Sequence, residues 1–238
     1  LGKIILGINP SQTDESFGIT FNVVLHLATV FSTWVVFRKE IAEIFSGLFQ
    51  FKANESFWFS VKIILSMIPA ALVGLLFEDT IDATFSGSAL LIGFMLLLTG
   101  ALLFLADKAT VTDRKIGFKE AFIVGIAQMI ALAPGISRSG ATISTCVILK
   151  VDKERAARFS FLMVMPLILG KVAKDLLDDK FNLATETLLP MGIGFMASFV
   201  VGLFACTWML NIVKKGKLVY FSFYCFVVGA ISIAVGLS

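Results

Sequence analysis

A short polar stretch interrupts a long apolar segment of the chain at residues 131–144, ALAPGISRSGATIS. Pro134 cannot continue a helix, and Gly135 permits a sharp turn. Ser137 and Ser139 follow at once, and either hydroxyl could cap a new helix. The stretch therefore predicts that one helix ends at the Pro-Gly pair and that a second helix begins a few residues later.

The start of that second helix combines several groups that bind phosphate in proteins. Gly140, Ala141 and Thr142 are expected to form its first turn, and the N–H groups of a helix N-terminus attract anions. Arg138 adds a permanent positive charge on a planar fork that suits phosphate oxygens. The small residue at position 140 lets an oxyanion approach the backbone. The residue types predict a phosphate or diphosphate site formed by Ser137, Arg138, Ser139, Gly140 and Thr142.

A plainer interpretation is that Arg138 extends to the membrane interface and that its neighbours form an ordinary turn. Placing an arginine at mid-membrane costs roughly 2.5–3.5 kcal/mol on insertion scales, so such a residue is usually retained for function. We therefore favour anion binding. Gln128 could face the same site, although helix packing is the favoured interpretation. His26, the only histidine, is either a proton-transfer group or ligand, or a side chain bonded to a neighbouring helix.

The composition indicates a polytopic membrane protein. Of the 238 residues, 58% are hydrophobic and 16% are charged, whereas soluble domains average roughly 45–50% and roughly 25%. The three cysteines lie in apolar runs and are expected to be small buried hydrophobes; no metal-ligand spacing is present, so we assign no metal ligands. A crossing helix needs about 20 mostly apolar residues. Six runs qualify: residues 17–37, 57–77, 88–106, 158–176, 188–213 and 218–237.

The segment 118–149 has a different topology from these crossings. Loops rich in Lys and Arg lie on the cytoplasmic side of a membrane, and basic loops flank this segment on both sides. It must therefore leave and return on one face, yet two full crossings would need about 40 apolar residues. We predict a re-entrant helical hairpin that breaks at Pro134-Gly135, with the polar stretch at its buried tip.

Three crossings precede this hairpin and three follow it, which predicts an inverted repeat. The expected fold is an all-α polytopic membrane protein, a single integral membrane domain over residues 1–238. Its first repeat would be the remnant 1–112, whose own hairpin is expected before Leu1. The second repeat would be residues 113–238, with the hairpin at 118–149.

The stretch QMIALAPGISRSGATIS resembles the second signature of the bacterial undecaprenyl-diphosphatase family (BacA/UppP type). The segments FNVVLHLATVFSTWVVFRKEI, MIPAALVGLLFEDTI and RFSFLMVMPLILG also resemble family segments, in the family's order. The resemblance covers essentially the whole chain. It implies an inverted repeat with two re-entrant hairpins.

The resemblance also implies an activity. The family hydrolyses undecaprenyl diphosphate to undecaprenyl phosphate, which recycles the lipid carrier for peptidoglycan synthesis and confers bacitracin resistance. It implies a divalent cation (Mg or Ca), a multi-pass protein of the bacterial plasma membrane, and a polyprenyl diphosphate substrate among membrane lipids, with no nucleic acid. A homo-oligomer is left open. By motif, Ser137, Arg138, Ser139 and Thr142 would hold the diphosphate, with Arg138 as the catalytic charge stabiliser.

This chain departs from the family pattern in one respect. The family's first signature, a glutamate pair followed by a serine-rich stretch ending in Gly-His, is absent from it. That signature, with the proposed metal-binding carboxylates, is expected just before Leu1. One rival class, the lipid phosphatases with a phosphorylated histidine, is excluded because Ser144 stands where their histidine would be. A transporter or flippase whose hairpin binds an anion remains the alternative function.

Overall fold

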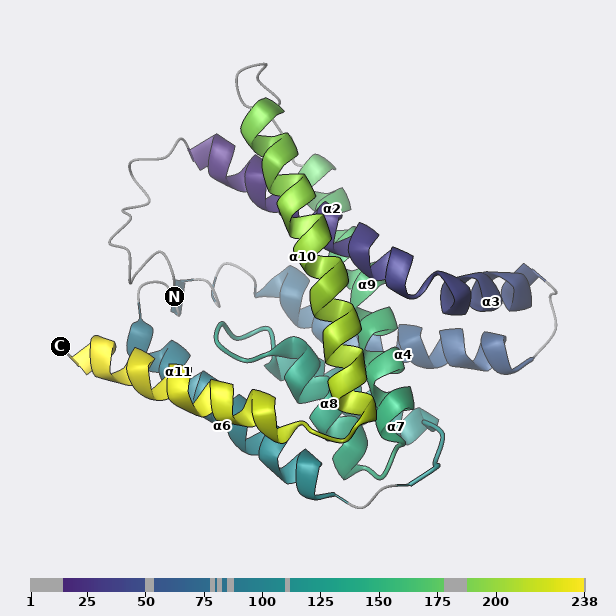
Figure 1. Ribbon diagram of the computed structural model, residues 1–238. Coiled ribbons are helices and arrows are strands. Elements are labelled where there is room, and N and C mark those ends of the chain that lie inside the picture. The colour runs from purple at the N-terminus through teal and green to yellow at the C-terminus, as the bar shows by residue number, and fades with distance from the viewer. Residues whose placement is uncertain are drawn as a thin grey trace.

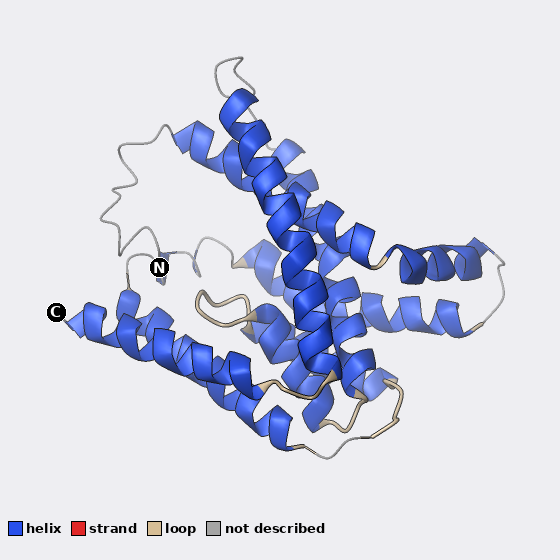
Figure 2. Cartoon of the chain, in the orientation of Figure 1, coloured by secondary structure: helices blue, strands red, loops and turns tan. Residues whose placement is uncertain are grey.

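The computed structural model describes residues 15–49, 54–77, 80, 83–84, 88–109, 112–177 and 188–237. Within these ranges the chain is helical and contains no strand (Figure 1, Figure 2). The helices are α2 (Glu15–Val36), α3 (Arg38–Phe49), α4 (Glu55–Leu76), α6 (Ala89–Lys108), α7 (Phe118–Ile130), α8 (Arg138–Ile148), α9 (Lys153–Leu177), α10 (Leu188–Lys214) and α11 (Val219–Leu237).

Five of these helices, α4, α6, α9, α10 and α11, are long and apolar enough to cross a membrane. The helices α2 and α3 are long and apolar enough only when taken together, and they would form a sixth crossing if they are one span broken by a bend of 78°. The prediction of an all-α polytopic membrane protein is therefore confirmed. Arg38 and Lys39 directly follow the first predicted apolar run and do not lie in a loop. They instead begin α3, whose sequence RKEIAEIFSGLF alternates polar and apolar residues with helical spacing.

The crossings pack in pairs, α6 with α11 and α2 with α10, while α4 packs on α7 (Figure 1). Small residues allow the closest of these approaches. A Cβ atom added at Gly93 of α6 would lie 2.9 Å from the carbonyl oxygen of Gly229 in α11. The hydroxyl of Ser222 donates a 2.7 Å hydrogen bond to the carbonyl of Gly100 across the same interface. Such small-residue contacts and interhelical hydrogen bonds are how membrane helices associate without a hydrophobic driving force.

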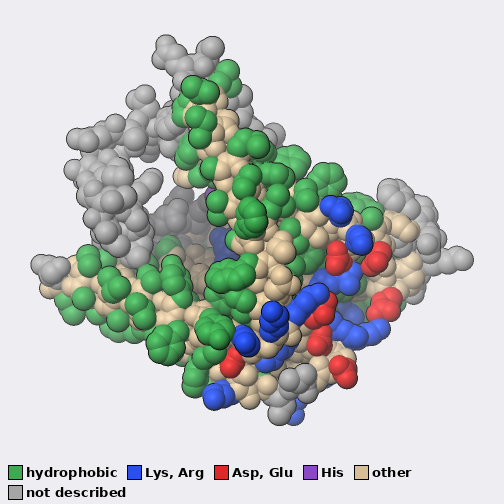
Figure 3. Space-filling model, in the orientation of Figure 1, with side chains coloured by type: hydrophobic (Ala, Val, Ile, Leu, Met, Phe, Trp, Pro, Cys, Tyr) green, Lys and Arg blue, Asp and Glu red, His purple; other side chains and the backbone are tan. Residues whose placement is uncertain are grey.

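The basic loops assigned to one face lie together in the structure. Lys214, at the end of α10, forms a 2.6 Å ion pair with Glu154 near the start of α9. Arg158, one turn further along α9, pairs with Glu43 of α3 at 3.1 Å. Figure 3 shows the charged side chains gathered at this end, while the visible faces of α10 and α11 are mainly hydrophobic. Glu78 and Asp79, which follow the second apolar run, and residues 178–187, which follow α9, lie outside the described residues.

The main apolar core surrounds the second half of the hairpin. Phe159 and Met163 of α9 and Ile143 of α8 are all fully buried. They belong to one cluster that also receives Ile63 from α4 and Leu103 from α6. Because α8 is enclosed by α6, α7 and α9, the position of its first turn is fixed by three neighbouring helices.

Candidate active site at the hairpin tip

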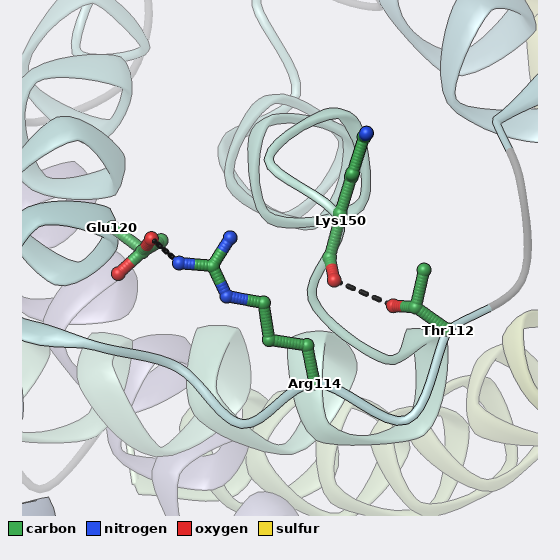
Figure 4. A network of polar contacts seen from close by, with 4 residues as sticks. All are labelled: Thr112, Arg114, Glu120 and Lys150. Carbon is green, nitrogen blue, oxygen red and sulfur yellow. Dashed lines mark hydrogen bonds and ion pairs between the residues drawn. The ribbon is translucent and has the colours of Figure 1, made fainter.

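The two arms of the hairpin, α7 and α8, fold back so that their outer ends meet. The hydroxyl of Thr112, before α7, donates a 2.5 Å hydrogen bond to the carbonyl of Lys150, after α8. The N–H of Asp152 bonds to the carbonyl of Arg114 at 3.1 Å, and the Arg114 guanidinium pairs with Glu120 of α7 at 2.6 Å (Figure 4). The segment thus begins and ends at one place. That this hairpin is re-entrant in a membrane stays a prediction.

The tip joins the arms through a tight turn at residues 131–137. Gly135 has a φ of +97°, which side-chain-bearing residues rarely adopt. A Cβ atom at this position would also lie 2.7 Å from the carbonyl oxygen of Ile92 in α6. Gly135 is thus required twice, by its backbone conformation and by the close approach of α6. The expected helix break at Pro134-Gly135 is confirmed, since α7 ends at Ile130 and α8 begins at Arg138.

The second helix begins earlier than the sequence suggested. Its first turn consists of Arg138, Ser139 and Gly140, so the expectation that it starts at Gly140 was wrong by two residues. The reason is the cap. Ser137, one of the two candidates, takes the N-cap position, and its hydroxyl oxygen accepts a 3.1 Å hydrogen bond from the Gly140 N–H. Its O–H hydrogen remains able to donate to a ligand oxygen.

Thr99 of α6 supports this cap, and the sequence analysis missed it. The Ser137 N–H donates to the Thr99 hydroxyl at 3.2 Å, and that hydroxyl donates in turn to the Met95 carbonyl at 3.1 Å. A Cβ atom at Gly140 would lie 3.1 Å from the Thr99 methyl group. The only available sequence signal was a hydroxyl residue in the middle of an apolar crossing, and nothing local connected it to the hairpin.

The predicted phosphate ligands differ in how accessible they are. Ser137, Arg138 and Ser139 are half-buried, whereas Gly140 and Thr142 are buried. The Thr142 hydroxyl bonds to the Arg138 carbonyl at 2.8 Å and also contacts the Ser160 hydroxyl of α9. Thr142 therefore anchors the first turn of α8 to α9, and Ser160 is a second contributor that the sequence did not single out. The hairpin brings all five predicted residues together at one helix N-terminus.

Arg138 dominates the electrostatics of the hairpin. It is the only charged residue between positions 121 and 148. Its charge adds to the partial positive charge of the α8 N-terminus, where the first-turn N–H groups find no partner within the helix. Both contributions favour a negatively charged group next to Ser137 and Ser139.

Two polar side chains within the hairpin arms are buried without a hydrogen-bond partner in the described structure. They are Gln128 of α7, whose two amide atoms are both unpaired, and Ser144 of α8. Both residues are 0% exposed. A buried polar group without a partner costs about 1–3 kcal/mol, so each is the kind of group that a bound polar ligand or water would satisfy. Gln128 was a candidate site residue.

His26 lies in another part of the molecule. It is an exposed residue of α2, and the main contacts of α2 are with α10, α9 and α3 rather than with the hairpin arms. The structure therefore does not bring His26 to the hairpin tip. It leaves both sequence-based interpretations of this residue open.

The structure offers no cluster of acidic, histidine or cysteine ligands for the expected divalent cation within the described ranges. No three His, Cys, Asp or Glu side chains within the described ranges lie close enough to hold a metal. The expected carboxylate ligands were assigned to a segment before Leu1, which lies outside the described residues.

The fold is that of an all-α polytopic membrane protein, and the five predicted phosphate ligands lie together at the tip of its helical hairpin. The profile of the bacitracin resistance protein BacA family matches residues 1–231, and the chain belongs to this family. It is 57% identical to an undecaprenyl-diphosphatase of Christiangramia forsetii, over 98% of this chain and 87% of the relative. It is 44% identical to that of Parabacteroides distasonis (98% and 88%) and 38% identical to that of Halothermothrix orenii (94% and 84%).

Proposed function

We infer that this protein is an undecaprenyl-diphosphatase, which hydrolyses undecaprenyl diphosphate to undecaprenyl phosphate and inorganic phosphate. The observation that carries the inference is the hairpin tip, where Arg138 stands in the first turn of a helix whose N-terminus is capped by Ser137. Membership of the BacA family and near full-length relatives named undecaprenyl-diphosphatase support it. The substrate is a polyprenyl diphosphate lipid. The reaction recycles the lipid carrier of peptidoglycan synthesis and accounts for bacitracin resistance.

The geometry suggests how the tip residues act in this reaction. Water attacks the terminal phosphorus, the bond to the bridging oxygen breaks, and the lipid monophosphate leaves. Negative charge builds on the bridging and terminal oxygens in the transition state. Arg138 and the first-turn N–H groups of α8 are preorganised donors for that charge. Ser137 and Ser139 would orient the diphosphate through their hydroxyl hydrogens.

Thr142 was predicted to bind the diphosphate directly, but the hydrogen bonds of its hydroxyl support a positioning role instead. The hydroxyl bonds to the Arg138 carbonyl and contacts Ser160, so we propose that Thr142 holds Arg138 in position. Gln128 would face the substrate through its unpaired amide. We also propose a divalent cation, on the family resemblance alone.

We propose the bacterial plasma membrane as the location, since the chain has several membrane-capable helices and its relatives come from bacteria. The exposed apolar side chains of α10, among them Leu189, Phe204 and Trp208, would face lipid acyl chains or a second copy of the protein. A homo-oligomer would use such a face.

The rival function is transport or flipping of an anionic lipid without hydrolysis, and one experiment separates the two. The purified protein is reconstituted in liposomes with undecaprenyl diphosphate, and released inorganic phosphate is measured beside the transbilayer distribution of the lipid. A phosphatase releases phosphate in proportion to the substrate consumed. Redistribution of intact diphosphate lipid with no phosphate release would refute the proposed function.

A further inference from the structure

A polar cavity of about 370 Å³ lies at the outer end of the hairpin. Its walls come from α3, the start of α4, the segment before α7 and the start of α9. Its size falls within the range of small-molecule sites, roughly 300–1,000 Å³. We call it the basic cavity, after the four cations among its charged lining residues: Lys62, Lys115, Arg155 and Arg158, with the carboxylates Glu43 and Glu55.

Two of the four cations are neutralised by these carboxylates. Lys115 pairs with Glu55 at 2.5 Å, and Arg158 pairs with Glu43 at 3.1 Å. The cavity therefore carries an excess of two positive charges. Such an excess favours an anionic occupant, because the protein itself supplies no further carboxylate to the cavity lining.

The excess charge belongs to Lys62 and Arg155, neither of which forms an ion pair in the described part of the chain. The Lys62 ammonium lies 5.4 Å from the centre of the Phe118 ring. The Arg155 guanidinium donates a long hydrogen bond, 3.3 Å, to the carbonyl of Asp113. Both contacts hold the cations in place and leave most of their donors unused, since an ammonium has three N–H donors and a guanidinium has five.

The depth of the cavity indicates what kind of anion it suits. Lys62 lies seven residues after Glu55 in the membrane-capable helix α4, which corresponds to about 10 Å along the helix axis. The cavity thus extends from the charged rim of the protein to a level where apolar side chains begin, and Phe59 and Ile116 line it there. Lipid phosphates occupy this zone between water and acyl chains, and basic cavities between helices on the cytoplasmic side bind anionic headgroups.

We propose that the basic cavity binds the phosphate of an anionic ligand, with Lys62 and Arg155 as its principal contacts. A phospholipid headgroup and free inorganic phosphate share this chemistry. The cavity is distinct from the hairpin tip. Ile116 lies just before α7, and the 13 residues of that helix span about 20 Å. The proposal therefore does not rest on the proposed phosphatase activity.

The test compares a double variant, Lys62→Gln with Arg155→Gln, with a control that removes the same charge, Lys119→Gln with Lys215→Gln. Both control lysines are exposed and lie outside the cavity lining. In one arm, each protein is embedded in phosphatidylcholine nanodiscs that contain some phosphatidylglycerol. Native mass spectrometry of the protein released from the discs then gives the number of phosphatidylglycerol molecules that remain bound to it. In the other arm, protein in phosphatidylcholine discs is titrated with inorganic phosphate and followed by phosphorus NMR line broadening.

We expect the cavity variant to retain phosphatidylglycerol about tenfold less well than the control. If the cavity variant differs from the control only in a smaller phosphate line broadening, the natural ligand is free phosphate from solution rather than a lipid headgroup. Equal behaviour of both variants in both arms would overturn the proposal. Because a double variant could fail to fold, Lys62→Gln alone is measured as well, and phosphate release from undecaprenyl diphosphate reports an intact fold. If the parent protein shows no phosphatase activity, the proposed function is refuted. Phosphatidylglycerol retention can still be compared between the variants, so the cavity proposal is tested independently.

Discussion

The backbone N–H of Ser137 donates a 3.2 Å hydrogen bond to the hydroxyl of Thr99, which lies 38 positions earlier in the chain. Through this bond, α6 fixes the residue that caps α8. Arg138 follows directly in sequence, so its backbone position depends on the same contact. Thr99, which is not among the predicted phosphate ligands, can therefore influence how the proposed anion site is presented.

We predict that Thr99→Val weakens catalysis through this contact. The valine keeps the shape of the side chain but leaves the Ser137 N–H without a partner, a cost of about 1–3 kcal/mol. Phosphate release should show a kcat lowered about tenfold with a smaller change in KM. Thr99→Ser keeps the hydroxyl and should restore most of the rate. A Thr99→Val protein that keeps the parent rate while Thr99→Ser loses it would show that the methyl group, not the hydrogen bond, matters.

Gly140→Ala should damage the cap from the other side. The added Cβ would lie 3.0 Å from the Ser137 hydroxyl oxygen and 3.1 Å from the Thr99 methyl group, so the capping serine has to move. Loss of an N-cap costs about 1 kcal/mol, and the thermal midpoint in detergent should fall together with activity.

The matched control for Gly140→Ala is Gly192→Ala in α10, where no atom lies within 4 Å of the added Cβ. Alanine favours helix over glycine by about 1 kcal/mol, so this variant should keep its activity, and its thermal midpoint should stay level or rise. A Gly140→Ala protein that behaves like Gly192→Ala would refute the packing argument at the tip.

The crossings and the helix break could be predicted from the sequence because their causes are local. The apolar runs that became α4, α6 and α11 are long enough to identify by themselves. Pro134 and Gly135 mark the break by their own backbone preferences. The five predicted phosphate ligands lie within six consecutive positions, so any helix that begins there places them all near its N-terminus.

The features that sequence reasoning missed depend on contacts between distant segments. Thr99 and Ser160 meet the hairpin only because α6 and α9 pack on α8. The start of α8 was misplaced because Ser137 and Ser139 are equally good caps by type, and the Thr99 contact favours Ser137. The helix α3 was not predicted, because it is too short and too charged to be identified as a crossing.

Gln128 offers a test of a buried, unpaired amide. Replacing it by leucine removes two polar atoms that are without partners in the described structure, which would relieve a penalty of about 1–3 kcal/mol. We expect Gln128→Leu to raise the thermal midpoint in the absence of substrate. A lower midpoint would show that the amide is hydrogen-bonded in the native protein.

The kinetics of Gln128→Leu test whether the amide contacts the substrate. If Gln128 faces the substrate, as we propose, Gln128→Leu should raise KM for undecaprenyl diphosphate despite its higher stability. Unchanged kinetics would return Gln128 to the helix-packing interpretation. Ser144→Ala allows the same comparison of stability and kinetics on the other arm of the hairpin, α8, because the buried Ser144 hydroxyl also lacks a hydrogen-bond partner in the described structure.

The central claim is that Arg138 stabilises the charge of the reacting diphosphate, and the most direct measurement is phosphate release from undecaprenyl diphosphate by Arg138→Ala. Removing one preorganised transition-state donor typically costs 10²–10³ in rate, so we predict kcat/KM at least about a hundredfold below the parent. Arg138→Lys should recover only part of this loss, because an ammonium lacks the planar fork. Arg38→Ala, an exposed arginine of α3, should match the parent. An Arg138→Ala protein that releases phosphate at the parent rate would contradict the account.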